Sequence, residues 1–441
     1  MKRAVQFPKD ESVYRNSERP QGSSVFGIGK DMAVTLLTGG SDRPYVFGLS
    51  TELMSKGVSI DLIGSDELNE PAFRDKPRLK FLNLRGDLRP NAGILSKVAR
   101  VLKYYLRLIF YAGKAEPRIF HILWNNKFET FDRTLLMLYY RFLGKKTVLT
   151  VHNVNAAKRD SEDTFINRLT LRIQYRLADH IFVHTEKMKY ELIDAFGVQE
   201  ARVTVIPFGI NNSVPNGHLT PREAKRRLGI RENERTLLFF GRITPYKGLE
   251  YLIDAFHRVR AQHENYRLII AGRLDAASGE KYWNTLRERI REAVEEGQIV
   301  LRIEYIPDAE TEIYFKAADV LVLPYRHIYQ SGVLFLSHSF GLPVLAADVG
   351  SLKEEIVEGK TGFIFTPEDS NDIARAIERY FSSDLFDDLS SRREAIRNFA
   401  MEQHSWHVIG LKTLDIYAEL LRTKTRGVLP GRDASGASLS I

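Results

Sequence analysis

An arginine and a lysine stand five positions apart in the stretch FGRITPYKGLE, residues 240–250, between two glycines. The forked guanidinium of an arginine can bind two oxygens of an anion, and a lysine adds a compact positive charge. Gly241 permits a close approach of the backbone to a ligand. Arg242 and Lys247 are therefore candidates for holding a diphosphate. The alternative is that both are solvated loop charges.

A second turn with anion-binding character is Gln330-Ser331-Gly332, which comes directly before the apolar segment VLFLSHSF. Backbone N–H groups at a helix start point outward and favour negative charge. The N–H groups of Ser331, Gly332 and Val333 would bind a second phosphate there. Two such turns at one edge of a sheet predict a nucleotide diphosphate as the ligand.

The elements that must position these turns are strands and helices in alternation. Strand-length apolar runs alternate with amphipathic segments up to a linker at residues 210–220, and the alternation begins again with TLLFFG. This pattern predicts two doubly wound α/β domains with parallel sheets. Ligands of such sheets bind at the carboxyl ends of the strands, and two facing sheets create a cleft.

Composition limits the classes of protein. A chain of 441 residues is expected to form two domains. It has no cysteine, which excludes disulfides and thiolate metal sites. No apolar run of membrane-spanning length and no signal-peptide core are found, so we expect a cytoplasmic protein.

Charge is unevenly distributed along the chain. Residues 1–210 hold 33 Lys and Arg against 23 Asp and Glu, a net charge of +10, and the remaining residues hold 31 against 33, a net charge of −2. A basic first half suits nucleic acid, an anionic membrane or phosphorylated substrates. Nucleic acid is the least favoured, because no RNP-like aromatic motif, zinc-finger spacing or basic region with heptads occurs.

Taken together, the motifs resemble the family 4 glycosyltransferases, which have the GT-B fold. GRITPYKGLEYLIDAF is similar to the donor-phosphate loop of the family, and SGVLFLSHSFGLPVLAADVGSLKEEIVEGKTGFIFTPED to its nucleotide-sugar region. HTEKMKYELIDAFGVQEARVTVIPFGIN is similar to the interdomain crossing, and LLTGG and VHNVN fit the first domain. The resemblance covers about residues 31–425.

The resemblance implies a division of the chain. Two Rossmann-like domains would face each other across a cleft, between flexible tails at residues 1–30 and 426–441. Residues 31–208 would bind the acceptor, completed by a closing helix at about residues 405–425. Residues 209–404 would bind the nucleotide sugar.

It also implies roles for single residues. Arg242 and Lys247 would bind the donor diphosphate and stabilise the leaving group, as a metal does elsewhere. The chain has no Asp-X-Asp motif, and no metal or cofactor is expected. His152 matches a histidine near the reacting sugar, although a structural role is an even alternative. The donor site would be completed by Gly39, Gly40, Gly241, Gln330, Ser331, Gly332 and Val333.

One departure from the family pattern affects the donor. Members usually carry a glutamate just before the second glycine turn and another five residues before the glycine that ends the helix. Alignment on Gly332 and Gly341 places Tyr329 and Leu336 there. Gln330 would supply part of the sugar contacts. A catalytically silent GT-B subunit, which binds a nucleotide sugar or a partner transferase, is the alternative.

The acceptor side has less distinct signals. Trp124, Asn125, Asn126 and Lys127 follow a predicted strand and would face the acceptor. Residues 94–114 form an amphipathic helix with Lys97, Arg100, Lys103 and Arg107 opposite its apolar residues. That helix either lies on an anionic membrane beside a lipid-linked acceptor or packs on the first sheet.

The resulting hypothesis is a transferase of EC 2.4 that retains the anomeric configuration. It would move a sugar from a nucleotide-diphosphate sugar to a hydroxyl of a saccharide or lipid-linked acceptor, in surface polysaccharide or glycolipid synthesis. The expected location is the cytoplasm, with peripheral contact at the inner face of the membrane.

Overall fold

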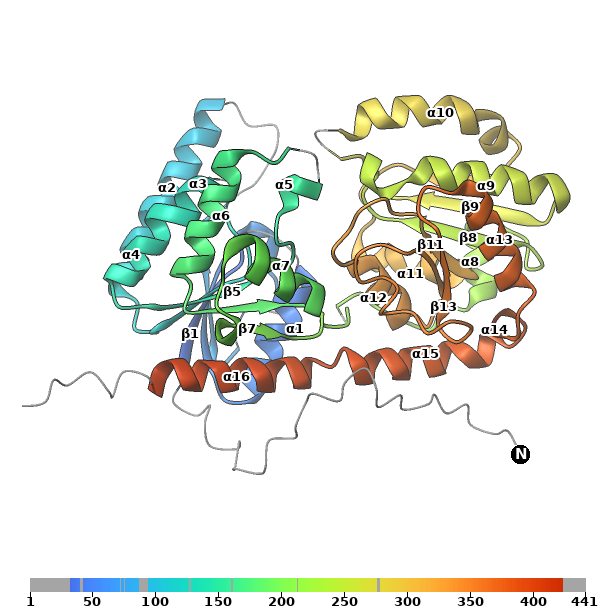
Figure 1. Ribbon diagram of the computed structural model, residues 1–441. Coiled ribbons are helices and arrows are strands. Elements are labelled where there is room, and N and C mark those ends of the chain that lie inside the picture. Colours follow the sequence, from blue (N-terminus) through green and yellow to red (C-terminus); the bar gives the residue numbers. More distant parts are fainter. Residues whose placement is uncertain are drawn as a thin grey trace, which may run out of the picture.

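The structure is a computed structural model that describes residues 32–39, 43–71, 73–74, 76–86, 94–126, 128–159, 162–211, 213–275 and 278–422, apart from the side chains of Ile94, Leu95, Lys97 and Arg159. The predicted tails, residues 1–30 and 426–441, lie outside the described residues. Figure 1 shows two α/β halves side by side, with a long helical segment running beneath both.

The first half is built on a parallel sheet with strand order β3-β2-β1-β4-β5-β6-β7. Strands β1, β4, β5 and β6 are almost entirely buried, as expected for strands covered by helices on both faces. Its strands are β1 (Ala33–Leu37), β2 (Ser59–Gly64), β3 (Leu79–Asn83), β4 (Ile119–Ile122), β5 (Lys146–Thr150), β6 (His180–Val183) and β7 (Val203–Val205).

Helical segments of this half are α1 (Arg43–Ser55), η2 (Asp66–Leu68), α2 (Ile94–Lys114), α3 (Glu129–Phe131), η3 (Asp132–Leu136), α4 (Met137–Phe142), α5 (Ala156–Arg159), α6 (Phe165–Leu177), α7 (Glu186–Phe196) and η4 (Glu200–Arg202). Segment η3 is a π-helix, which runs between α3 and α4 without a break. A π-helical turn is rare and often lies at a functional site.

The second half repeats the plan with a parallel sheet of order β10-β9-β8-β11-β12-β13. Its strands are β8 (Arg235–Phe240), β9 (Tyr266–Ala271), β10 (Ile299–Arg302), β11 (Val320–Leu323), β12 (Val344–Ala347) and β13 (Gly362–Phe365). Its helical segments are α8 (Pro221–Arg227), η5 (Pro245–Lys247), α9 (Leu249–Gln262), α10 (Gly279–Glu295), α11 (Asp308–Ala317), α12 (Gly332–Ser339), α13 (Ser370–Phe381), α14 (Asp384–Asp387) and α15 (Leu389–Gln403).

Both sheets reverse their strand order, between β1 and β4 and between β8 and β11. Open α/β sheets bind ligands in the crevice that such a reversal creates at the carboxyl ends of the strands. The prediction of two doubly wound parallel sheets from the sequence is confirmed. None of the described helices is both long and apolar enough to cross a bilayer.

The chain crosses between the halves twice, and the crossings touch at Ile210. The Ile210 N–H donates to the carbonyl oxygen of His404 (3.1 Å), and the Ile210 carbonyl accepts from the indole N–H of Trp406 (3.0 Å). Trp406 opens α16 (Trp406–Arg422), which packs on α1 of the first half. A Cβ at Gly48 or Gly209 would overlap the Trp406 ring, so both glycines leave room for it.

Candidate functional site

The turn after β8 holds the two cations singled out in the sequence. Gly241 has φ +106° and Gly248 has φ +62°, conformations that glycine adopts without strain. A Cβ at Gly248 would overlap the carbonyl oxygen of Pro324, so the turn is pressed against the chain that follows β11. The short helix η5 and then α9 begin directly after, which places both cations at the carboxyl edge of the sheet.

Lys247 is buried among aromatic rings. Its ammonium nitrogen lies 5.1 Å from the ring centre of Tyr325 and 6.0 Å from that of Phe239, and the residue is 6% exposed. Ring faces attract a cation, the more so when it is desolvated. The nitrogen also lies 3.0 Å from the place of a Cβ at Gly241, so the lysine curls back over the turn.

Arg242 differs from Lys247 in its surroundings. Its side chain is 53% exposed, and a guanidinium nitrogen lies 3.3 Å from a carboxylate oxygen of Asp275. The arginine is thus paired with Asp275 while about half of its side chain stays accessible to solvent.

The second glycine turn lies against the first. The place of a Cβ at Gly241 is 3.4 Å from Cγ2 of Val333, which is in the first turn of α12. Ser331 also meets Tyr325, the ring below Lys247, with 3.5 Å between the two hydroxyl oxygens. The N-terminus of α12 and the lysine therefore meet around Gly241, although they are far apart in the sequence.

The start of α12 has an uncapped N-terminus and a buried amide without a partner among the described residues. Ser331 is the N-cap residue but makes no side-chain cap bond, and the space beside the Cα of Gly332 is open. Both polar atoms of the Gln330 amide are buried and have no hydrogen-bond partner among the described residues. Buried polar groups are normally paired, so Gln330 is a strong candidate for binding a ligand.

On the first half, Gly39 follows β1 with φ +59°. A Cβ there would lie 2.6 Å from the carbonyl oxygens of Trp124 and Asn125, which only glycine tolerates. Arg85 donates a hydrogen bond to the carbonyl oxygen of Gly39. Gly40 lies outside the described residues.

His152 follows β5 in an aromatic and imidazole cluster. Its ring stacks on Trp124 with 4.1 Å between centres and an angle of 3°, and Nδ1 shares a hydrogen bond of 3.0 Å with Nε2 of His184. Nε2 of His152 is buried without a partner among the described residues. Burial first, and then the charge of His184, hold the pKa of His152 well below its ordinary value, so the ring is neutral at pH 7.

Two residues of this region were not singled out in the sequence. Tyr45, in α1, presents its ring edge-on to His152 with 4.8 Å between centres, and Tyr325 connects Lys247 to Ser331. The only sequence signal for Tyr325 was its position directly after a strand, in DVLVLPY. His184, which follows β6, holds the ring of His152 through the hydrogen bond to Nδ1.

The predicted acceptor residues divide into two groups. Trp124 and Asn125 line a cavity of about 270 Å³ together with His152, and the Asn125 amide pairs reciprocally with Gln174 (3.1 and 2.7 Å). Asn126 is not among the residues that line this cavity, and its side chain accepts a hydrogen bond from Tyr104 (2.7 Å). Lys127 lies outside the described residues.

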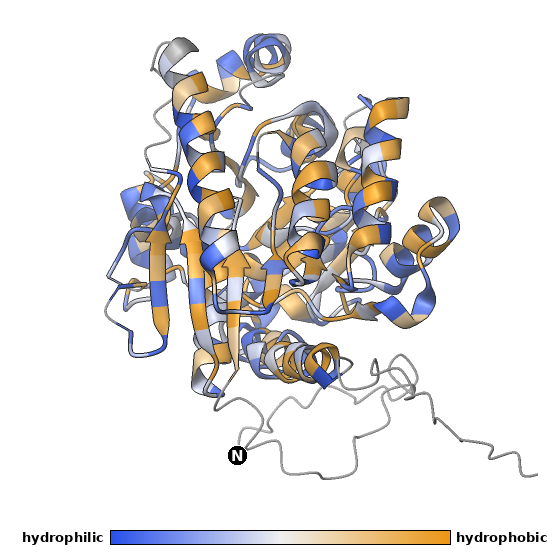
Figure 2. Cartoon of the chain, turned by 90° about the vertical axis from the view of Figure 1, so that its left-hand side faces the viewer, coloured by the Kyte–Doolittle hydropathy of each residue, from blue (hydrophilic) through white to orange (hydrophobic). Residues whose placement is uncertain are grey.

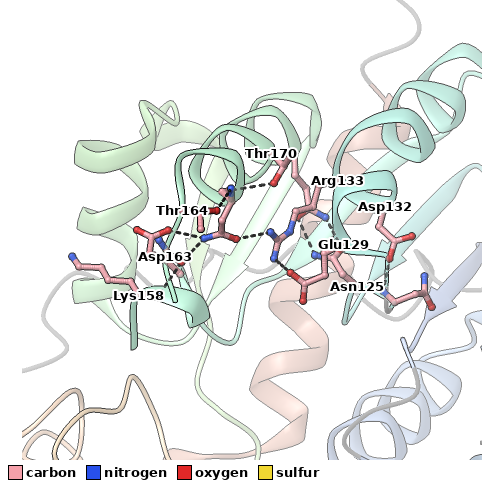
Figure 3. Close-up of polar contacts among 12 residues, drawn as sticks. Asn125, Glu129, Asp132, Arg133, Lys158, Asp163, Thr164 and Thr170 are labelled. Atoms are coloured by element: carbon pink, nitrogen blue, oxygen red, sulfur yellow. Dashed lines mark hydrogen bonds and ion pairs between the residues drawn. The ribbon is translucent and has the colours of Figure 1, made fainter. Parts of the chain in front are cut away.

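Two residues that line this cavity, Glu129 and Arg133, belong to a polar network (Figure 3). Arg133, in η3, donates to Asn167 (2.8 Å) and pairs with Glu129. Asn167 continues the network to the carboxylate of Asp163 (2.8 Å) and to Asn155 (2.9 Å). The network connects η3 to α6 and to the loop that precedes it.

A second cavity, of about 450 Å³, lies between the halves. Lys158, Lys187 and Glu191 line it from the first half, and residues 327–329 and 348–350 from the second. The Tyr329 hydroxyl donates to a carboxylate oxygen of Glu191 across the cleft (3.0 Å).

The two positions where the sequence departs from the family pattern have different surroundings. Tyr329 lines the cleft, whereas Leu336 is 6% exposed in the core of the second half. In the part of the chain that the structure describes, no group of three or more His, Asp or Glu side chains is arranged to hold a metal ion.

Comparison with known proteins identifies similar sequences and folds. The model of group 1 glycosyl transferases matches residues 221–402, and that of glycosyltransferase family 4 matches residues 39–214. An uncharacterized glycosyltransferase of Methanocaldococcus jannaschii is 29% identical over 53% of this chain and 58% of its own length. The D-inositol 3-phosphate glycosyltransferase of Corynebacterium aurimucosum is 26% identical over 62% and 65%. The matched part thus spans about three fifths of these relatives.

Solved structures share the fold at low sequence identity. Sucrose-phosphate synthase from Thermosynechococcus elongatus aligns with a TM-score of 0.71 and 18% identity, over 89% of this chain and 100% of its own. Anabaena HepE in complex with UDP and glucose aligns with a TM-score of 0.68 and 16% identity, over 88% and 100%. At such identities the likeness concerns the fold alone.

Proposed function

This chain belongs to family 4 of the glycosyltransferases and has the GT-B fold, and from that premise we propose that it transfers a sugar from a nucleotide-diphosphate sugar to a hydroxyl group with retention of configuration. The acceptor is a saccharide or a lipid-linked saccharide. We assign the donor to residues 209–404, and the acceptor to residues 31–208 with the closing helix at about 405–425.

The observation that carries the proposal is the meeting of two anion-binding features at Gly241. Lys247, which lies beside the rings of Tyr325 and Phe239, and the first turn of α12 both lie next to this glycine. A diphosphate satisfies both, because it offers several oxygens to N–H donors and negative charge to the ammonium group.

In the proposed reaction, the bond between the anomeric carbon and the diphosphate oxygen breaks while the acceptor oxygen bonds to that carbon on the same face. The acceptor proton passes to the leaving phosphate oxygen. Arg242 and Lys247 stabilise the charge that develops on the diphosphate, in the role a metal has elsewhere, so we propose a metal-independent reaction without a cofactor.

Other groups orient the donor. The backbone N–H groups of Ser331, Gly332 and Val333 bind phosphate, and the unpaired amide of Gln330 contacts the sugar. Gly39 and Gly241 let the backbone approach the donor closely. The neutral ring of His152 lies beside the reacting sugar, held by Trp124 and His184.

The acceptor enters the cavity lined by Trp124 and Asn125, where an indole face and paired amides suit a hydroxylated ring. We propose a place in surface polysaccharide or glycolipid synthesis, in the cytoplasm, with peripheral contact at the inner face of an anionic membrane. Because the corynebacterial relative is named a D-inositol 3-phosphate glycosyltransferase, we also propose to test an inositol phosphate as the acceptor.

A second candidate is a silent GT-B subunit, and a specific observation favours it. The hydroxyl of Tyr329 is engaged with Glu191, and Leu336 lies in the core, so neither position offers the donor a carboxylate. Arg242 and Lys247, which match the donor-phosphate loop of the family, favour an active transferase over the silent subunit.

The test is the thermal stability of the protein with UDP, GDP, ADP, TDP and their sugar conjugates, each with and without EDTA. A ligand at 100 times its Kd raises the free energy of unfolding by about 2.7 kcal/mol. We expect one nucleotide to stabilise the protein equally in EDTA, which would also identify the base for turnover assays. Stabilisation by none of them would make the silent subunit the better description.

A further inference from the structure

Three helical segments lie side by side on the outside of the first half: α2, the continuous η3 and α4, and α6 (Figure 1). The Tyr139 hydroxyl donates to the carbonyl oxygen of Ile109 (3.1 Å), which fixes α4 against α2, and Arg133 in η3 bonds Asn167 in α6 (2.8 Å). We call the outward side of these segments, together with Phe128 beside them, the three-helix surface.

The three-helix surface concentrates exposed apolar side chains. Eleven of the fifteen large hydrophobic residues exposed among the described residues lie on it. The most exposed are Phe142 (86%), Phe165 (78%) and Phe110 (68%). Soluble monomers usually scatter such side chains singly, so a concentration of this size indicates an interaction surface.

Helix α2 shows that packing among the described residues does not account for this surface. Tyr104, Tyr105 and Leu108 face the core, whereas Val98, Leu102, Leu106 and Phe110 recur every fourth residue on the outside. The sequence analysis left open whether residues 94–114 pack on the sheet or face a membrane. The helix does pack on the sheet, and it has a second apolar side that the described residues leave uncovered.

The charge of the surface has one sign. The sequences of α2, α4 and α6 contain no Asp or Glu, and the one carboxylate of η3, Asp132, is buried. Basic residues are exposed along the helices: Lys103, Arg107, Arg141, Arg172 and Arg176. Figure 2, which faces this side, shows hydrophobic and hydrophilic segments alternating along its helices. Among the acidic residues beside the surface, Glu129 pairs with Arg133 and Asp163 with Arg168.

We propose that the three-helix surface docks on a bilayer that contains anionic lipids. The phenylalanine and leucine side chains enter the interface, and the lysine and arginines contact lipid phosphates. Charge favours this partner over a second copy of the chain, because a symmetric dimer would place two positive surfaces against each other. The inference rests on the proposed function in one respect: a lipid-linked acceptor would reach the cavity at Trp124, whose wall includes Arg133 and Gln174 of the same segments.

The experiment is sedimentation of the full chain with phosphatidylcholine vesicles, with and without phosphatidylserine, at low and high salt and in the absence of nucleotide and acceptor. We expect binding only with phosphatidylserine, and weaker binding at high salt. The variant Lys103→Glu with Arg107→Glu should lower the vesicle partition coefficient about tenfold or more.

A second variant tests the apolar part: Leu106→Gln, Phe142→Gln and Phe165→Gln together should also abolish most of the binding. The matched controls are Arg287→Glu with Arg291→Glu on α10, and Tyr305→Gln with Met401→Gln, which are exposed residues of the second half. Both controls should bind vesicles like the unchanged protein. The melting temperature of each variant, with and without the stabilising nucleotide, checks that it folds.

The proposal is overturned if the unchanged protein stays in solution with anionic vesicles, or if both surface variants bind them as it does. It is also overturned if the unchanged protein is a dimer that the surface variants dissociate, because the surface would then be a protein interface. The proposed function fails separately, through the absence of stabilisation by any nucleotide.

Discussion

At the scale of single residues, the site depends on how a charge is buried. Lys247 is 6% exposed between Tyr325 and Phe239, and Lys225 of the same half is also 6% exposed. The ammonium group of Lys225 lies 2.9 Å from the carboxylate of Asp319, in the interior of the second half, whereas Lys247 lies at the turn after β8, next to the N-terminus of α12. Because of these different positions, we expect Lys247 to contact a ligand and Lys225 to stabilise the fold.

Lys247→Ala is expected to lower turnover by about 100-fold or more, since it removes a charge that stabilises the leaving group. Lys225→Ala is expected to lower the free energy of unfolding by about 3–5 kcal/mol, because it leaves a buried carboxylate unpaired, with turnover per folded molecule unchanged. Turnover with the donor identified by thermal stability, and unfolding in urea, measure the two effects. Equal effects of both changes on turnover would contradict the assignment of Lys247.

His338 in α12 predicts how stability depends on pH. Burial, and to a lesser extent His404, lower the pKa of His338 to about 3, whereas in the unfolded chain a histidine titrates near 6.5. The unfolded state therefore binds more protons below pH 6.5, and the free energy of unfolding falls as the pH drops from about 6.5 toward 4. Above pH 6.5 this contribution is complete.

His338→Leu should remove up to about 1.4 kcal/mol per pH unit of this dependence, measured by urea unfolding between about pH 7 and 5. His218→Leu, at an exposed histidine, is the matched control. Other buried histidines contribute in the same direction, because burial lowers the pKa of His121 to about 3 and that of His184 to about 4. An unchanged slope in His338→Leu would show that this residue titrates normally in the folded protein.

At the scale of elements, the turn between β8 and α9 is shaped by its glycines. Gly248 combines φ +62° with a carbonyl oxygen in the place of a Cβ, whereas Gly229 has φ +71° and open space around it. Alanine substitutions at the two glycines therefore separate the energetic cost of the left-handed backbone conformation from the cost of steric overlap.

Gly229→Ala is expected to cost about 1 kcal/mol of stability, from the left-handed conformation alone. Gly248→Ala should cost more than Gly229→Ala, because Pro324 and the turn must also move apart, and it should weaken nucleotide binding. Urea unfolding and the nucleotide-dependent melting temperature measure these effects. An equal cost at both positions would mean that the turn adapts without disturbing the site.

Much of the element level could be predicted from the sequence, because strand and helix patterns are local. The alternation of apolar runs with amphipathic segments predicted both parallel sheets, and Gly241 and Gly332 indicated turns after strands. The meeting of Val333 with Gly241 could not be predicted from spacing, since it depends on how β8 and β11 pair. The π-helix η3 and the outward apolar side of α2 likewise follow from packing between helices that the pattern of one helix does not contain.

At the scale of the whole molecule, contacts across the cleft join the halves. Arg43 of α1 binds Asp308 of α11 (2.8 Å), and Phe208 stacks on Phe335 with 5.2 Å between ring centres. Trp406 anchors the returning chain in the first half, against Gly48 and Gly209.

Trp406→Ala is expected to lower the stability of the first half by about 3–5 kcal/mol, through lost burial and the cavity that remains. Calorimetry should show the transition of the first half at a lower temperature while that of the second half stays. Met401→Ala, at a residue 60% exposed in α15, should change stability by no more than about 0.5 kcal/mol. If the two changes had similar effects, Trp406 would have no anchoring role.

The two chain crossings that hydrogen-bond at Ile210 have a consequence for motion. Two domains joined by a single linker can rotate relative to each other in several directions. Two linkers that are hydrogen-bonded side by side instead restrict the motion to rotation about one hinge axis. Rotation about the line through Ile210 and His404 keeps both hydrogen bonds, whereas twisting or sliding breaks them. We therefore expect any opening of the two halves to follow essentially one path, so that the donor of the proposed reaction would leave the second half by the route along which it entered.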